Sequence, residues 1–343
     1  MTDRQTGVRK CYSTVDVCKL IMAVLVLIMH SNTLHTSSFF NMFNYCFTTI
    51  AVPFFFIISG YFFEKGLARA ENKQRYLFSY EKKLLLLYLC WAIVMLPSVI
   101  INYNRLYTNK DAWYIFLLIL RRYFLCGEGV FWYILVMAES AIVIYFISML
   151  KKKWVLLICI VMGLLLCLLY DSNMIQNFFI DKMNSFFYSV FSWSNNFIMK
   201  GVPFMGIGFL LNGLDERNPR TVCKVSLIVF LLVSIVSVAL YILNYRIGYI
   251  YILQTVSIAL FSIHFYIDVP AEKSIVIREL SSSIYFLHTF FLYYFIEIVF
   301  GKELFIPLKA FLAIALCIIT YTIIKMILKK FDIKILKIMF NIK

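Results

Sequence analysis

The sequence predicts an all-α, polytopic integral membrane protein, and three observations support this fold class. Of the 343 residues, 62% are hydrophobic and 15% are charged, whereas about 25% are charged in a typical soluble domain. The mean hydropathy is +0.85. Apolar runs long enough to cross about 30 Å of hydrocarbon recur along the whole chain. Together these features indicate about ten transmembrane helices.

The expected spans are apolar runs separated by short polar or charged segments. We expect the first run to be retained, because it is too long for a cleavable signal peptide and carries two ionisable residues. In chain order the ten expected spans are residues 14–34, 43–63, 84–101, 129–149, 154–170, 197–213, 224–243, 247–267, 282–300 and 304–328.

The positive charges predict the orientation of these spans. With a cytoplasmic N-terminus, 23 lysines and arginines fall in cytoplasmic segments and seven in external ones. This asymmetry satisfies the positive-inside rule and predicts that both termini are cytoplasmic. The net charge of +15 is therefore mainly an orientation signal. A nucleic-acid partner is not expected, since no soluble module with a basic face is evident.

We expect one membrane domain over residues 1–343, with short basic cytoplasmic tails at 1–13 and 329–343. Two stretches leave the exact helix count open. Residues 110–126 combine aromatic side chains with two arginines, a pattern that suits an interfacial helix, a re-entrant piece or a loop. Residues 171–196 are rich in Phe, Ser and Asn and could contain an eleventh membrane segment.

The first span carries the most informative residues, Lys19 and His30. Eleven helical steps turn the chain through three turns plus about 20°, so both side chains share one face, about 16 Å apart along the axis. Asp16 joins the same stripe. Because ionisable groups are costly in hydrocarbon, this alignment favours a lined pathway or a reaction site. The alternatives are a Lys19 that snorkels to the headgroups and a His30 satisfied within the core.

Two further ionisable residues lie within the expected spans. Glu139 is the acid deep in the fourth span and could orient the His30 imidazole, or it could be a protonated structural carboxyl. Lys200, in the sixth span, could line a substrate path or pair with an acid. The nine cysteines lack the spacing of a zinc site, and we expect no metal.

Six short motifs, taken in order, resemble the acyltransferase 3 family. Lys19, ten residues and His30, preceded by Asp16, are similar to the family's first helix, in which an arginine or lysine precedes a catalytic histidine. The resemblance covers about 15–325. The other motifs are Val52–Tyr61 with its Ser-Gly-Tyr, the basic stretch Lys82–Tyr88, the aromatic Phe131–Leu135, Asn196–Gly208 with its Gly-Val-Pro-Phe, and Ser283–His288.

The resemblance implies a multi-pass membrane O-acyltransferase, of the kind found in bacterial plasma membranes. It would transfer an acyl group, such as acetyl, from acyl-CoA to a hydroxyl of a cell-envelope carbohydrate. The implied partners are acyl-CoA, an envelope glycan or lipid-linked sugar, and membrane lipid. Acetyl-CoA would be a co-substrate, and no permanently bound cofactor is expected.

The family pattern also suggests roles for single residues. His30 would be the catalytic base, with Glu139 as its partner. Substrate binding is assigned to Lys19, Asp16, Lys82, Lys83, Trp132 and Lys200, and packing to His288. The chain departs from the family pattern in having Lys19 where arginine is commoner and Asn195 where the family carries arginine. A lysine keeps the charge but loses the planar fork of a guanidinium.

Two other classes of function stay open. The chain also resembles the membrane part of vancomycin-resistance serine racemases, which implies a transporter-like module for a small amino acid such as L-serine. A racemase would need a soluble domain with a pyridoxal-phosphate lysine, and we expect none in this sequence. The third class is a non-catalytic envelope protein, which the presence of both Lys19 and His30 disfavours.

Overall fold

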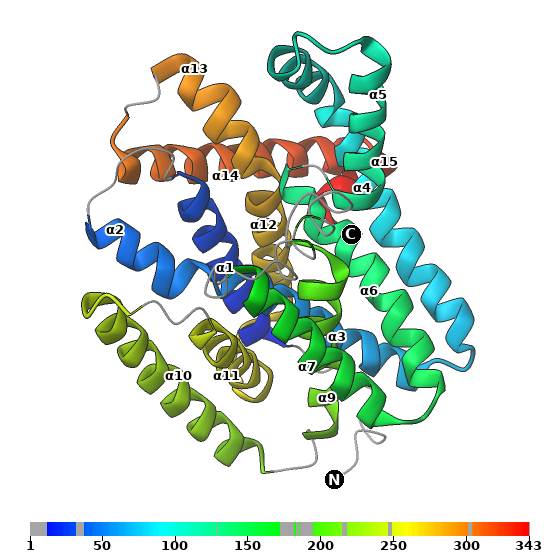
Figure 1. Cartoon of the computed structure of the whole chain (residues 1–343), viewed down its shortest axis with the longest axis vertical. Coiled ribbons are helices and arrows are strands. Elements are labelled where there is room, and N and C mark those ends of the chain that lie inside the picture. The colour runs from blue at the N-terminus through cyan, green and yellow to red at the C-terminus, as the bar shows by residue number, and fades with distance from the viewer. Residues whose placement is uncertain are drawn as a thin grey trace.

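The protein is a bundle of helices (Figure 1). The structure, a computed structural model, describes residues 12–31, 38–127, 129–171, 182, 185, 195–214, 218–245, 249–300 and 304–342. These residues contain helices and no strand, which confirms the predicted all-α class.

The regular elements follow the expected apolar runs. The α-helices are α1 (Ser13–Ser31), α2 (Ser38–Phe43), α3 (Ala51–Arg69), α4 (Lys73–Leu106), α5 (Ala112–Arg121), α6 (Trp132–Met149), α7 (Lys153–Asp171), α9 (Val202–Leu211), α10 (Pro219–Ile242), α11 (Ile250–His264), α12 (Ala271–Thr289), α13 (Glu297–Phe300), α14 (Ile306–Lys330) and α15 (Lys334–Phe340). Among the described residues, four short segments are π-helical: η1 (Asn44–Thr48), η2 (Arg122–Cys126), η4 (Phe197–Gly201) and η6 (Phe290–Ile296). Two of the described segments are 3₁₀ helices: η3 (Gly129–Phe131) and η5 (Asn212–Leu214).

The described part of the chain does not confirm all ten expected membrane spans. Three expected spans correspond to apolar helices of at most 17 residues, which are shorter than the roughly 20 residues that cross the hydrocarbon. The prediction of ten spans and the cytoplasmic placement of the termini therefore stay predictions. In the described part of the chain, six helical segments are long and apolar enough to cross a membrane: Ser13–Ser31, Ser38–Arg69, Gly129–Met149, Pro219–Ile242, Ala271–Phe300 and Ile306–Lys330.

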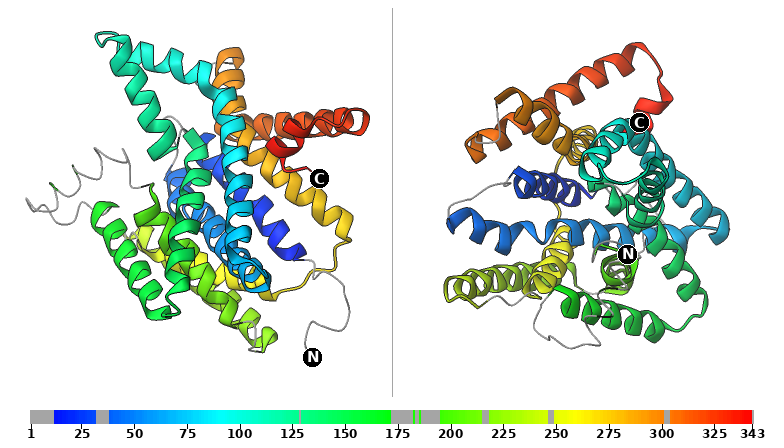
Figure 2. Two further views of the ribbon diagram at one scale, coloured as in Figure 1. Left: turned by 90° about the vertical axis from the view of Figure 1, so that its right-hand side faces the viewer. Right: turned by 45° about the horizontal axis from the view of Figure 1, so that its top comes forward.

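Helix α4 would be a seventh span, but it bends by 47° between Lys73–Pro97 and Val99–Leu106. Pro97 explains the bend, since it lacks an N–H and its ring clashes with the preceding turn. Beyond the bend, α5 projects from the edge of the bundle (Figure 2). The ambiguous stretch 110–126 is thus largely helical, while almost all of the possible extra segment 171–196 lies outside the described residues.

Helices α1 and α12 lie side by side and run in the same direction. At one end the Ser274 hydroxyl donates to the Asp16 carboxylate at 2.7 Å, and at the other the rings of His30 and His288 lie 5.2 Å apart. The two pairs have the same offset along the chain, so a single parallel register joins both helices. We call the end where α1 and α12 begin the basic end.

The other helices are oriented by contacts at the basic end. Lys65, near the end of α3, donates to the Tyr12 hydroxyl at 2.5 Å, so α3 runs antiparallel to α1. Lys325, near the end of α14, forms a 2.9 Å ion pair with the buried Glu279 of α12. A lysine near the end of α3 therefore lies beside the start of α1, and a lysine near the end of α14 lies beside the middle of α12.

Helices α3 and α9 cross with their backbones in direct contact. A Cβ at Gly60 would lie 1.9 Å from the carbonyl oxygen of Met205. A Cβ at Gly208 would lie 1.9 Å from the carbonyl oxygen of Ile57. Small residues at such crossings let membrane helices approach closely, and this contact holds α3 beside α9.

The C-terminal segment expected as a basic tail folds back onto the bundle as α15. The Trp91 indole N–H of α4 donates to the Met339 carbonyl at 3.1 Å. Phe340 is 3% exposed and its ring contacts that of Trp91. Burial of apolar side chains and the hydrogen bond from Trp91 thus hold α15 against the bundle. The charges of this segment alone had predicted a tail. Of the other expected tail, residues 1–11 lie outside the described residues.

The α3–α9 crossing predicts that Gly60→Ala and Gly208→Ala lower the stability of the folded protein by about 1–3 kcal/mol each, the usual cost of overpacking. Alanine is the better helix former by about 1 kcal/mol, but the neighbour here is backbone and cannot rotate away. Thermal unfolding in detergent measures the effect. Gly213→Ala is the control, because no atom lies within 4 Å of its added Cβ. Equal unfolding temperatures for all three variants would contradict the prediction.

Candidate functional site

A cavity of about 450 Å³ opens between α1, α4, α12 and α15 near the basic end. Its described lining holds four cationic side chains and no carboxylate. We call it the basic cavity. Three serine hydroxyls add hydrogen-bonding capacity, so the lining suits an anionic, oxygen-rich ligand. The cations are Lys19, Lys83, Arg278 and Lys337, and the serines are Ser59, Ser281 and Ser282.

Lys19 enters this cavity from the first half of α1. Its ammonium lies 5.6 Å from the centre of the Phe62 ring, within cation–π range. The neighbouring Asp16 is 7% exposed and accepts the Ser274 hydrogen bond, so it lines neither this cavity nor the second one described below. Asp16 thus joins α1 to α12, while Lys19 faces the ligand space.

The basic stretch at the start of α4 divides into two roles. Lys83 lines the basic cavity. Lys82, the residue before it, lines neither cavity. Helical geometry explains the difference, because consecutive side chains point about 100° apart. The two lysines therefore form a matched pair for experiments.

A second cavity of about 320 Å³ lies at the opposite ends of α1 and α3, and His30 lines it. We call it the histidine cavity. Trp132, at the start of α6, and Lys200, in η4, also face it. The Lys200 ammonium donates to the Asn195 amide oxygen at 2.7 Å, and Asn195 is itself a lining residue. Two predicted substrate-binding residues therefore lie in the same cavity as His30.

His288, which the sequence analysis assigned to packing, lies beside His30 on α12. It is fully buried. Its Nδ1 lies 2.7 Å from the Tyr285 carbonyl and 3.2 Å from the Ile284 carbonyl. Carbonyls only accept, so Nδ1 carries the proton and Nε2 is left as an acceptor. Nε2 has no hydrogen-bond partner among the described residues.

The end of α1 that carries His30 is held by α14 and η6. The Tyr293 hydroxyl donates to the His30 carbonyl at 3.1 Å. Near Tyr293, Lys309 is 1% exposed and forms a 2.6 Å ion pair with Glu297. The Lys309 ammonium also lies 6.0 Å from the centre of the Tyr293 ring. A buried charge pair thus supports the tyrosine that positions the His30 backbone.

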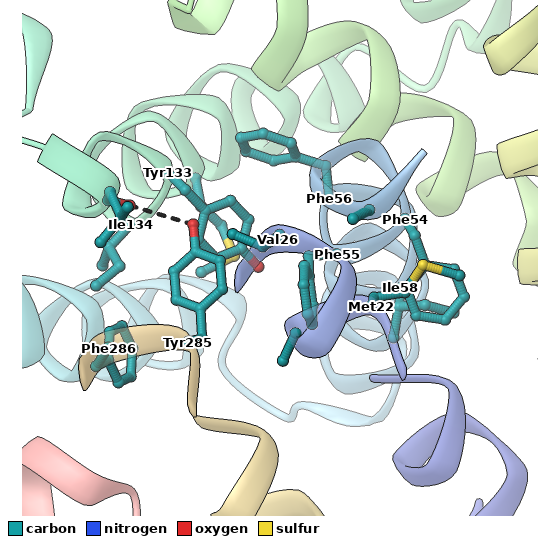
Figure 3. Packing of buried hydrophobic residues seen from close by; sticks show 14 of the residues in the cluster. Met22, Val26, Phe54, Phe55, Phe56, Ile58, Tyr133, Ile134, Tyr285 and Phe286 are labelled. Carbon is teal, nitrogen blue, oxygen red and sulfur yellow. Dashed lines mark hydrogen bonds between the residues drawn. The ribbon is translucent and has the colours of Figure 1, made fainter. Parts of the chain in front are cut away.

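Tyr285 lines both cavities and forms the wall between them. Its hydroxyl donates to the Val130 carbonyl at 3.1 Å. Its ring lies 5.6 Å from those of Phe55 and Tyr133, and these two rings are 5.9 Å apart. Figure 3 shows the three side chains facing one another. We call Phe55, Tyr133 and Tyr285 the aromatic septum.

Glu139 lies on α6 but lines neither cavity. Its Oε2 is buried and has no hydrogen-bond partner among the described residues. No described contact joins it to His30, so its proposed partnership with the imidazole stays a prediction. Within the described residues, no group of three His, Cys, Asp or Glu side chains could hold a metal ion.

Four residues were not predicted from the sequence as site residues: Arg278, Tyr285 and Lys337, which line the cavities, and His288, which lies beside His30. The three on α12, with Ser281, have spacings of three, four and three residues. That spacing places them along one helix face, a signal that was available in the sequence. Lys337 carried no such signal, because its position depends on the docking of α15.

The positions of the cavities predict that they are reached from opposite faces of the membrane. In a variant whose nine cysteines are replaced, we expect Ser282→Cys to react with an impermeant maleimide on one face and Thr49→Cys on the other. Ser282 lines the basic cavity and Thr49 the histidine cavity. Labelling of sealed vesicles of both orientations measures this. The cysteine-free parent is the control, and labelling of both sites from one face would refute the arrangement.

Comparison with known proteins places the chain in a family. A family model described as an acyltransferase domain matches residues 12–327, nearly the whole chain. Neither a curated protein sequence nor a solved structure shows significant similarity to it. The match extends from the start of α1 almost to the end of α14, and it includes the lining residues of both cavities except Lys337, Ile338, Asn341 and Ile342. The protein therefore belongs to the acyltransferase 3 family of membrane acyltransferases.

Proposed function

We propose that the protein transfers an acetyl or similar acyl group from acyl-CoA to a hydroxyl of a cell-envelope carbohydrate. The observation that supports this most directly is the pair of cavities separated by Tyr285. One is lined by cations and the other contains a histidine. A donor with phosphates and an acceptor with hydroxyls require these two different environments.

The basic cavity is the proposed donor site. Four cations without a lining carboxylate suit the phosphates of CoA. The basic end also carries Lys65 of α3, in a segment that the positive-inside rule assigns to the cytoplasm, where acyl-CoA is made. The pantetheine arm would extend from this cavity along α1 toward the septum and present the thioester there.

His30 is the proposed general base. It removes the proton from the acceptor hydroxyl, and the oxygen attacks the thioester carbonyl carbon. The resulting tetrahedral intermediate collapses, the C–S bond breaks, and the CoA thiolate leaves and takes up the proton. An imidazole suits this task because it titrates near neutral pH. Trp132 and Lys200, which share the histidine cavity, would hold the acceptor.

His288 is the proposed partner of His30. Its Nε2 is an acceptor, its ring lies 5.2 Å from that of His30, and its own orientation is fixed by the Tyr285 carbonyl. An acceptor beside a general base can select the tautomer of the base and hold the ring in place. This arrangement gives His288 the orienting role that the sequence analysis assigned to Glu139.

The same two cavities also fit a second function, the transport of a small amino acid. Cavities reached from opposite faces and separated by a thin wall are what alternating access requires. The dense positive charge of the basic cavity favours an anionic donor over a zwitterion. Uptake of labelled L-serine by proteoliposomes that show no acyl-CoA turnover would support transport instead.

We expect purified protein in proteoliposomes to release free CoA and to transfer labelled acetyl to envelope extract. His30→Gln should lower kcat by about 10²- to 10⁴-fold, the usual contribution of a general base. Lys19→Ala and Lys83→Ala should raise the KM for acyl-CoA and leave kcat almost unchanged. Lys82→Ala is the matched control for Lys83→Ala. Turnover that survives in His30→Gln would rule out the proposed base.

His288→Phe should lower kcat and leave the KM for acyl-CoA almost unchanged, because the residue contacts His30 and does not line the basic cavity. His288→Gln, whose amide oxygen can accept a hydrogen bond where Nε2 does, should retain more activity than His288→Phe. Steady-state kinetics on protein with unchanged thermal stability tests both statements. A raised KM with normal kcat would contradict an orienting role.

A further inference from the structure

Helix α15 forms one wall of the basic cavity, and it lies beyond the part of the chain that matches the family. The match ends at residue 327, whereas Lys337, Ile338, Asn341 and Ile342 all line the cavity. This segment therefore adds surface to the donor site that the family's matched region does not supply.

The segment is docked in a defined position. Trp91 donates its indole N–H to the Met339 carbonyl, and its ring also stacks on Phe131 and Phe286 in the core. Met339 and Phe340 are 8% and 3% exposed. The buried Met339 and Phe340 thus fix the position of α15 and hold Lys337 at the cavity.

Lys337 is the cation that α15 brings to the cavity. Its ammonium forms a 2.6 Å ion pair with Asp332, in the turn between α14 and α15. The hydrogen bond and charge of Lys337 lower the pKa of the Asp332 carboxyl. Asp332 is 69% exposed, and exposed ion pairs are weak. A phosphate group could therefore replace Asp332 as the partner of Lys337. Lys334, on the same helix, is exposed and lines neither cavity.

We propose that α15 is part of the donor site and that Lys337 binds a phosphate group of acyl-CoA. This inference rests on the proposed function. Lys337 would leave Asp332 when the donor enters and would complete a set of cations with Lys19, Lys83 and Arg278 around the phosphates. The carboxyl-terminal helix is then a specificity-determining element for the nucleotide end of the donor.

The test is equilibrium binding of labelled CoA to the full-length protein in nanodiscs of zwitterionic lipid. Lys337→Gln should weaken binding about tenfold, which corresponds to one charge-assisted contact of about 1.4 kcal/mol. Lys337→Arg should restore most of the affinity. Lys334→Gln is the matched control on the same helix and should bind as the unaltered protein does.

Two further measurements sharpen the assignment. Trp91→Phe keeps the aromatic stacking but removes the hydrogen bond to Met339. It should therefore loosen the docking of α15 and weaken CoA binding without altering any cation of the basic cavity. Dephospho-CoA lacks the 3′-phosphate. If Lys337 contacts that phosphate, Lys337→Gln should not change dephospho-CoA binding, and if it contacts the pyrophosphate, the tenfold loss should persist.

The outcomes separate the two proposals. If the unaltered protein binds no CoA, the proposed function fails and this inference fails with it. If it binds CoA and Lys337→Gln binds equally well, only the role of Lys337 and α15 is overturned. That second result would also be found if the anion at Lys337 were a lipid headgroup instead of the donor.

Discussion

The parallel packing of α1 against α12 is the contact on which the rest of the site depends. The Asp16–Ser274 hydrogen bond at one end and the His30–His288 contact at the other belong to one register. A shift of either helix by one residue would rotate its side chains by about 100° and separate these partners. This register places Lys19 and Arg278 in the basic cavity and both histidines at the other end.

Burial of polar groups in this protein follows the cost of placing charge in hydrocarbon. Glu279 is 3% exposed but accepts hydrogen bonds from Tyr321 and Lys325, and Lys309 is paired with Glu297. Such pairing offsets the desolvation of each charge. The described lining of the basic cavity contains four cations and no carboxylate, and Lys337 pairs with the exposed Asp332, which is not a lining residue. Charges that stabilise the fold are therefore paired with opposite charges, whereas the basic cavity is lined by cations without a carboxylate among its described residues.

The aromatic septum relates the two cavities to each other. Phe55, Tyr133 and Tyr285 come from α3, α6 and α12, and their rings fill the centre of the bundle between the cavities. A wall of rings can be thin without holding water, since aromatic groups pack densely and expose little polar surface. In the proposed reaction, an acyl group would have to cross only this layer, while the phosphates of the donor and the acceptor would remain on opposite sides of it.

The sequence by itself determined the helical membrane class, the family, and the shared face of Lys19 and His30, because hydropathy and helical spacing are local properties of the chain. It also indicated Trp132 and Lys200, which the fold brings into the cavity of His30. Only the tertiary structure could separate Lys83 from Lys82, place His288 beside His30, identify Tyr285 as the wall and bring Lys337 into the basic cavity. Each of these depends on contacts between segments far apart in sequence, such as the docking of α15 on Trp91, and no local pattern encodes such contacts.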